Sequence, residues 1–180
     1  MTPLLDVATV ALERKDKVGL LAFDSRVRAF LPPRGGLQQL HGILRALAAL
    51  PHPTEPTSYL RSVRHVEARH KKRAFILFFT DFTDELSARE MYASLASLTR
   101  RHVLLFVAVG DPHLDRIFDD EGNGSHALFE KAAAGQLLVE RRRVLAGLER
   151  LGIHTLDAEP LRLSGPLLRK FLEVRLAGVL

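Results

Sequence analysis

The sequence predicts an α/β fold, in which helices cover both faces of a doubly wound, mostly parallel sheet. Residues 74–79 and 103–109 are apolar at every position, a pattern typical of strands that are buried on both faces. Stretches with apolar residues at helical spacing alternate with these runs, as parallel strands joined by helices require. Ligands of such sheets bind beyond the carboxyl ends of the strands, so residues 80–84 are the first candidates for a functional site.

The chain begins with a predicted helix over residues 2–15, where Leu and Ala recur at helical spacing. Residues 18–23 and 27–31 predict the two strands of a hairpin, because both are largely apolar and a tight Asp-Ser turn joins them. Pro32 and Pro33 are expected to end the second strand, since proline cannot donate a hydrogen bond to a neighbouring strand. We therefore expect this strand at the edge of a sheet.

A second helix is predicted over residues 37–50, and its apolar side chains form one stripe that we expect the core to bury fully. The stripe consists of Leu37, Leu40, Ile43, Leu44, Leu47 and Leu50. Three prolines separate this helix from a third one that starts at Tyr59. Thr57 or Ser58 is a suitable N-cap for the third helix, because a hydroxyl there can accept a hydrogen bond from the first turn.

Residues 74–80 are expected to form the central strand of the sheet, because a strand that is apolar throughout must have both faces covered. A helix over residues 85–99, capped by Thr83 or Asp84, follows this strand and leads into a second buried strand over 103–109.

Residues 113–126 predict a mobile loop with about one helical turn. The acidic residues at positions 119–121 resemble a sparse cation site, but they lack the alternating ligands and the terminal Glu of an EF-hand loop. The remaining elements are a long helix, a short strand and a last helix, over residues 127–151, 153–156 and 166–176.

Length and composition predict a single cytoplasmic domain over residues 1–180. The chain has no Cys, which excludes disulfides and thiolate metal sites and is compatible with a reducing compartment. Its apolar runs are shorter than the ~20 residues of a membrane-spanning helix, and its N-terminus lacks the pattern of a signal peptide. We therefore expect a soluble chain that makes no membrane contact itself.

The formal net charge of +5 could attract nucleic acid, anionic lipid or an acidic protein. The basic runs at 61–73, 100–102 and 141–143 lack the interleaved aromatic residues on which single-strand binders stack bases. They suit solvated helix faces and C-terminal caps, so no specific nucleic-acid partner is expected. Nucleic-acid binding stays an alternative, which salt-dependent retention on DNA would test.

The sequence lacks several motifs of known chemistry: a phosphate-binding glycine loop after a strand, a Gly-x-Ser-x-Gly elbow, and His residues at metal-ligand spacing. Hydroxyls and carboxylates near strand ends remain, and such oxygen ligands suit magnesium or manganese. Thr57 and Asp81 are the pair of interest. The alternative is that both side chains only cap local structure.

Five segments taken together resemble a known family. They are DKVGLLAFDSRVRAFLPPRGG, ILRALAAL, FFTDFTD, RRHVLLFVAVGDP and ERRRVLAGLERLGIHTLDAEP. In order and spacing they resemble the von Willebrand factor A-like domain of the bacterial "domain of unknown function 58" family, over nearly the whole chain. The resemblance implies a non-enzymatic protein-interaction module that works with a MoxR-type AAA ATPase in the assembly or maturation of other proteins. Full-length members often carry a membrane-anchored N-terminal part.

The resemblance also implies a magnesium site, built in such domains from three loops. Thr57 corresponds loosely to the second loop and Asp81 to the third, whereas the first loop and its strand have no counterpart here. We therefore expect the degenerate site to bind magnesium or manganese weakly or not at all. The residues at the upper rim of the sheet, which are Thr57, Asp81, Asp84 and Asp111, are the expected partner surface.

Two further expectations remain open. A strand that ends in Asp, with a Thr-Asp turn after it, could in another fold serve a magnesium-dependent phosphoryl-transfer enzyme. The strand that the family places between residues 18–23 and 74–80 is absent, and both flanking strands are apolar. Either these two strands pair directly, or a second copy of the chain covers them. We expect a homodimer.

Overall fold

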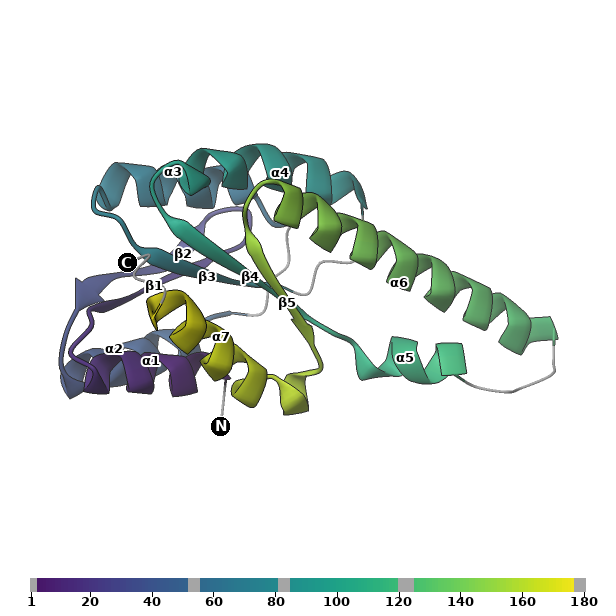
Figure 1. Cartoon of the computed structure of the whole chain (residues 1–180), viewed down its shortest axis with the longest axis horizontal. Coiled ribbons are helices and arrows are strands. Elements are labelled where there is room, and N and C mark those ends of the chain that lie inside the picture. The colour runs from purple at the N-terminus through teal and green to yellow at the C-terminus, as the bar shows by residue number, and fades with distance from the viewer. Residues whose placement is uncertain (1–2, 52–55, 81–84, 120–124, 177–180) are drawn as a thin grey trace. The chain divides into compact units, whose positions relative to one another are not determined.

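The computed structural model describes residues 3–51, 56–80, 85–119 and 125–176. Helices and strands alternate along the chain, so the predicted α/β class is confirmed (Figure 1). The chain forms two compact units. Unit 1 comprises Met1–Lys72 and Ser164–Val179, and unit 2 comprises Arg73–Leu163 with Leu180. The single domain expected over residues 1–180 stays a prediction.

Unit 1 is built on an antiparallel hairpin, with helices packed on it. Its elements are α1 (Pro3–Glu13), β1 (Val18–Phe23), β2 (Val27–Arg34), α2 (Leu37–Ala48), α3 (Tyr59–Arg69) and α7 (Ser164–Leu176). The hairpin lies between α3 on one side and α1 and α2 on the other (Figure 1). The predicted helices and the first strand are thus confirmed.

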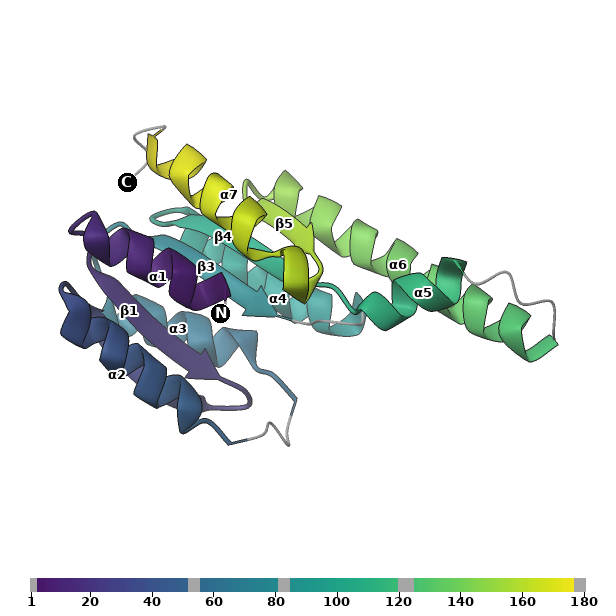
Figure 2. The ribbon, with the colours of Figure 1, turned by 90° about the horizontal axis from the view of Figure 1, so that it is seen from below.

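Helices α1 and α7 of unit 1 lie side by side (Figure 2), and two polar links join α7 to α1 and to the loop that follows α1. The Ser164 hydroxyl donates to the Asp6 carboxylate at 2.7 Å. Arg175 donates through Nε and Nη2 to both carboxylate oxygens of Asp16, at 3.0 and 3.1 Å. The last helix begins at Ser164, two residues before Pro166, because proline is tolerated in a first helical turn.

The prediction that Pro32 and Pro33 end the second strand was wrong, since β2 continues to Arg34, and Arg34 pairs with Val18. The only described neighbour of β2 is β1, so one of the two missing N–H groups falls on the outer side, and the register shift between Leu31 and Arg34 accommodates the other. The hairpin register shifts between Val18 and Leu20, where Gly19 lies. A Cβ atom there would lie 2.8 Å from the Leu31 carbonyl oxygen. Glycine is therefore required at this position.

Gly19→Ala is expected to lower the free energy of unfolding by about 1 to 3 kcal/mol, because backbone of β2 must move to accept the methyl group. The matched control is Gly165→Ala in α7, where an added Cβ meets nothing within 4 Å. The control should be neutral or stabilising by up to ~1 kcal/mol. Urea unfolding of both variants tests this, and equal effects of the two substitutions would contradict it.

The apolar stripe of α2 is buried only in part, in contrast to its prediction. Ile43 is 1% exposed, but Leu37 and Leu44 are 64% and 40% exposed. Helical spacing shows which side chains share a face, but how much of that face the neighbouring elements cover depends on their packing. No helix within the described ranges is long and apolar enough to cross a lipid bilayer.

Unit 2 contains a parallel three-stranded sheet in the order β3-β4-β5. Its elements are β3 (Phe75–Thr80), α4 (Glu85–Thr99), β4 (Val103–Val109), α5 (Pro112–Asp119), α6 (Ser125–Arg150), β5 (His154–Ala158) and the 3₁₀ helix η1 (Pro160–Arg162). Helices α4 and α6 contact each other, and the Tyr92 hydroxyl donates to the Val144 carbonyl oxygen at 2.9 Å. Met91, Leu95 and Leu98 are buried on α4, as predicted.

The prediction that residues 74–80 form the central strand was wrong. Among the described strands of unit 2, β3 stands at one end of the order β3-β4-β5 and β4 is in the centre. All residues of β4 but the last are buried, whereas in β3 only Phe78 is buried. An apolar run indicates that both faces are covered, but it carries no information on how many strands pair with it.

Residues 113–126 were expected to form a loop with about one helical turn, but the structure has the eight-residue helix α5 up to Asp119 and the start of α6 at Ser125. Helix α5 starts at Pro112, a residue that suits the first helical position because its φ angle is already helical. Helix α6 starts at Ser125. Leu114, Ile117 and Phe118 do have helical spacing, but the pattern covers only eight residues between turn-forming Gly, Asp and Pro, so it is too short to distinguish a helix from a loop.

Candidate functional site

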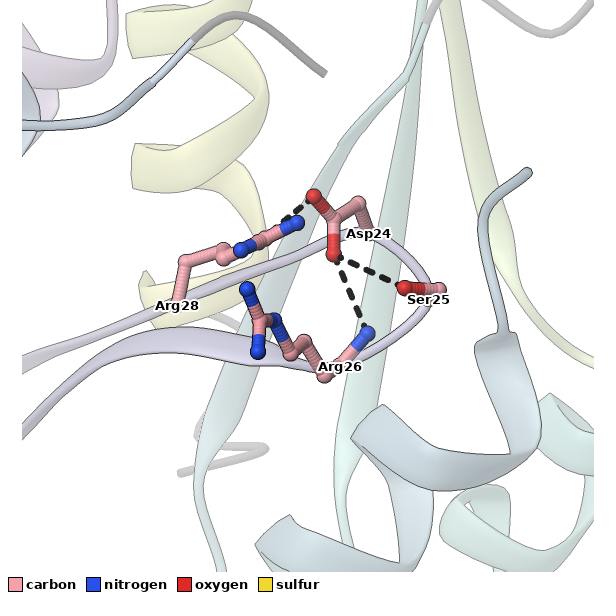
Figure 3. Close-up of polar contacts among 4 residues, drawn as sticks. All are labelled: Asp24, Ser25, Arg26 and Arg28. Carbon is pink, nitrogen blue, oxygen red and sulfur yellow. Dashed lines mark hydrogen bonds and ion pairs between the residues drawn. The ribbon is translucent and has the colours of Figure 1, made fainter. Parts of the chain in front are cut away.

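The tip of the hairpin in unit 1 holds a cluster of polar groups around the Asp24 carboxylate (Figure 3). Arg28 Nε donates to Asp24 Oδ2 at 2.6 Å, and the backbone N–H of Arg26 donates to Oδ1 at 3.0 Å. The Ser25 hydroxyl donates to Oδ1 across a longer 3.4 Å. Asp24 follows β1 directly and is 5% exposed. We call Asp24, Ser25, Arg26 and Arg28 the hairpin-tip cluster.

Opposing effects act on the pKa of Asp24. Burial raises the pKa, but hydrogen bonds from Arg26 N–H and Arg28 and the charge of Arg28 outweigh it, so the pKa lies below its ordinary 3.8. A carboxyl group whose pKa is lowered by folding stabilises the fold fully above its unfolded pKa. That contribution disappears as the pH falls through the folded pKa.

Asp24→Asn is expected to lower the melting temperature at neutral pH, because the neutral amide cannot form an ion pair with the Arg28 guanidinium. The difference from the unchanged protein should shrink below about pH 4 and vanish at still lower pH, where the carboxyl group is protonated in both states. Thermal melts from pH 7 down to pH 2 measure the two curves. A gap of constant size over this whole range would show that the charge of Asp24 does not stabilise the fold.

The backbone of the hairpin tip also positions the start of α3. The Ser58 N–H donates to the Asp24 carbonyl oxygen at 2.9 Å. The rings of Phe23 and Tyr59 meet edge to face, with centroids 6.1 Å apart and an interplanar angle of 74°. These contacts fix the residue that precedes Ser58, which is Thr57. Its side chain is exposed.

Ser58 is the N-cap of α3, so of the two predicted caps the second is confirmed. Ser58 occupies the N-cap position with an extended backbone conformation, but its side chain makes no capping hydrogen bond. Thr57 therefore is not used as a helix cap. An exposed hydroxyl on a backbone that two neighbouring contacts hold in place is suited to binding.

Asp111 in unit 2 is exposed and follows β4 by two residues. One of its carboxylate oxygens accepts a hydrogen bond from the His113 N–H at 2.9 Å, which satisfies a free donor at the start of α5. The other two predicted residues, Asp81 and Asp84, lie outside the described residues. The magnesium site at Thr57 and Asp81 and the partner surface therefore stay predictions.

Asp24 was predicted only as a turn residue, and its ion pair with Arg28 was not predicted. The signal was available, because an Asp and an Arg that flank a tight turn come close when two strands pair. The Asp24 carboxylate is occupied by Arg28 and by two local donors, so it is unsuited to act as a general base or a metal ligand. The hairpin-tip cluster is a support for the loop that carries Thr57.

Within the described ranges, no three His, Asp or Glu side chains gather in a group that could hold a metal ion. A family model described as "Protein of unknown function DUF58" matches residues 4–146. Neither a curated protein nor a solved structure shows significant similarity to the chain.

Proposed function

The chain belongs to the DUF58 family, and from this premise we propose that it is a non-enzymatic protein-interaction module with a von Willebrand factor A-like fold. The proposed partner is a MoxR-type AAA ATPase, with which the chain would act in the assembly or maturation of other proteins. The proposed location is the cytoplasm.

The presentation of Thr57 is the observation that supports binding best. Its side chain is exposed, while the adjacent Ser58 and Tyr59 are fixed by Asp24 and Phe23. A loop on a rigid scaffold gives up little conformational entropy when a partner binds, so it favours recognition. Asp111 supports the proposal in unit 2, since its exposed carboxylate follows the central strand of a parallel sheet.

Thr57→Ala and Asp111→Ala are expected to weaken binding to a purified MoxR-type ATPase by about threefold to thirtyfold each, the range of ordinary interface contacts. Thr57→Ala should change the free energy of unfolding by less than ~0.5 kcal/mol, because the side chain is exposed. Calorimetric titration measures the affinity, with Gln38→Ala on the exposed side of α2 as the control.

The titration is repeated with magnesium and with manganese, and we expect either ion to change the affinity little. Full binding by both variants would contradict the proposed surface. A strong dependence on magnesium that Asp81→Ala removes would instead favour a functional metal site, and would reopen the alternative of a phosphoryl-transfer enzyme.

A further inference from the structure

The outward side of α3 and the two lysines that follow this helix carry cationic side chains that the proposed function does not use. We call them the α3 basic surface, which consists of Arg61, Arg64, Arg69, Lys71 and Lys72. All five are exposed. Between Arg61 and Lys72 the sequence has a single acidic residue, Glu67. The surface belongs to unit 1, whose two segments contain 15 Lys and Arg against 7 Asp and Glu.

The inner side of α3 holds this surface in place. Tyr59, Ser62 and Val63 are buried, and the Ser62 hydroxyl donates to the Tyr59 carbonyl oxygen at 2.7 Å. The His65 ring meets the Phe30 ring of β2 at a centroid distance of 4.8 Å. The cations therefore project from a helix that is fixed to the hairpin, so binding would not have to order the backbone.

Stability of the fold does not explain the cations of the first two turns. The ion pairs of the described residues include none of the five side chains. Arg69 and Lys71 lie near the C-terminus of α3, where the helix dipole favours positive charge. Arg61 lies in the first turn, where the same dipole disfavours it. An anionic partner would compensate this unfavourable placement.

The chemistry of the surface favours an acidic protein segment over a nucleic acid. Leu60 is 39% exposed, and it lies beside Arg61 in sequence and one helical turn before Arg64. Phosphate backbones make no use of such an apolar side chain, whereas a peptide can place one of its own against it. Of the two rings on α3, Tyr59 is 4% exposed and His65 packs on Phe30, so neither is placed to stack on a base.

We propose that the α3 basic surface binds an acidic protein segment in which apolar residues alternate with carboxylates. Arg61 and Arg64 pair with the carboxylates, and Leu60 contacts the apolar residue. Arginine suits this task because its planar guanidinium can donate two parallel hydrogen bonds to one carboxylate. This surface excludes Thr57 and Asp111, so the inference holds or fails independently of the proposed function.

The test is fluorescence anisotropy with a labelled peptide of Glu-Glu-Leu repeats and, separately, a labelled DNA duplex. Arg61→Glu with Arg64→Glu is expected to weaken peptide binding by about tenfold or more. The control, Arg142→Glu with Arg143→Glu, makes the same charge change at exposed positions of α6 and should change binding by less than about twofold. Leu60→Gln is expected to weaken binding of the peptide and to leave binding of the duplex unchanged.

Arg61→Gln with Arg64→Gln repeats the measurement with neutral side chains, and thermal melts verify that each variant is folded. An equal loss of peptide affinity in the α3 and α6 variants would overturn the proposal, because binding would then depend only on the net charge of the chain. Tighter binding of the duplex, with a steep dependence on salt, would overturn it in favour of nucleic acid. Absence of peptide binding by the unchanged protein would also overturn it.

Discussion

Leu105→Ala is expected to lower the free energy of unfolding by about 3 to 5 kcal/mol, because Leu105 is 0% exposed in the central strand of unit 2 and its removal leaves a cavity. Leu77→Ala removes the same atoms from β3. Leu77 is directly paired with Leu105 in the parallel register but is buried only in part. Leu77→Ala should therefore lower the free energy of unfolding by only about 1 to 2 kcal/mol.

Urea unfolding at low micromolar protein concentration compares the two variants. They form a matched pair, since residue type, substitution and register position are the same and only the place in the sheet differs. If Leu77→Ala costs as much as Leu105→Ala, then β3 is as fully covered as β4 in solution.

Self-association of the purified chain is the second large expected effect, and it follows from the apolar sequence of β3, which stands at one end of the strand order β3-β4-β5. The strand is apolar from Phe75 to Phe79, without the Lys, Pro or bulge that protects natural sheet edges. The opposite edge strand, β5, carries exposed polar side chains at His154 and Asp157. We propose that a second copy of the chain pairs with β3 and forms the homodimer.

The orientation of the β3 backbone allows a sharp test of this pairing. Val103 N–H donates to the Ala74 carbonyl oxygen, so in the alternation of a strand the backbone groups of Phe79 face away from β4. Phe79→Pro removes an N–H that faces away from β4 without removing one from the ladder to β4.

Light scattering is expected to show a dimer for the unchanged protein and for Phe79→Ala, which keeps its N–H, and a monomer for Phe79→Pro. A monomer of the unchanged protein that binds no dye for exposed apolar surface would contradict the dimer. Association that persists in Phe79→Pro, with the fold intact, would place the contact at another surface.

Much of the secondary structure could be predicted because it depends on local spacing. The strand at 18–23, the helix at 85–99 and the strand at 103–109 have the predicted bounds, since apolar periodicity, caps and prolines act within a few residues. The extent of helix α5 was not predicted, because its three apolar residues at helical spacing form too short a pattern among turn-forming residues.

For the candidate site, the sequence could only indicate which hydroxyls and carboxylates lie near strand ends. These are Thr57, Asp81, Asp84 and Asp111. That Ser58 and not Thr57 caps α3 is decided by the bond from its N–H to the Asp24 carbonyl oxygen, 34 positions earlier in the chain. The pairing of Asp24 with Arg28 likewise depends on the hairpin, which brings the two side chains to 2.6 Å.

By itself the sequence determined the α/β class, most helix and strand positions, and the family, because these follow from local periodicity and from the order of short segments. Only the tertiary structure decided which strand is central, how far β2 extends beyond its prolines, and which cations of α3 lie outward. These depend on contacts between residues far apart in the chain. A residue's type limits what it can contact, but packing decides which of those contacts it makes.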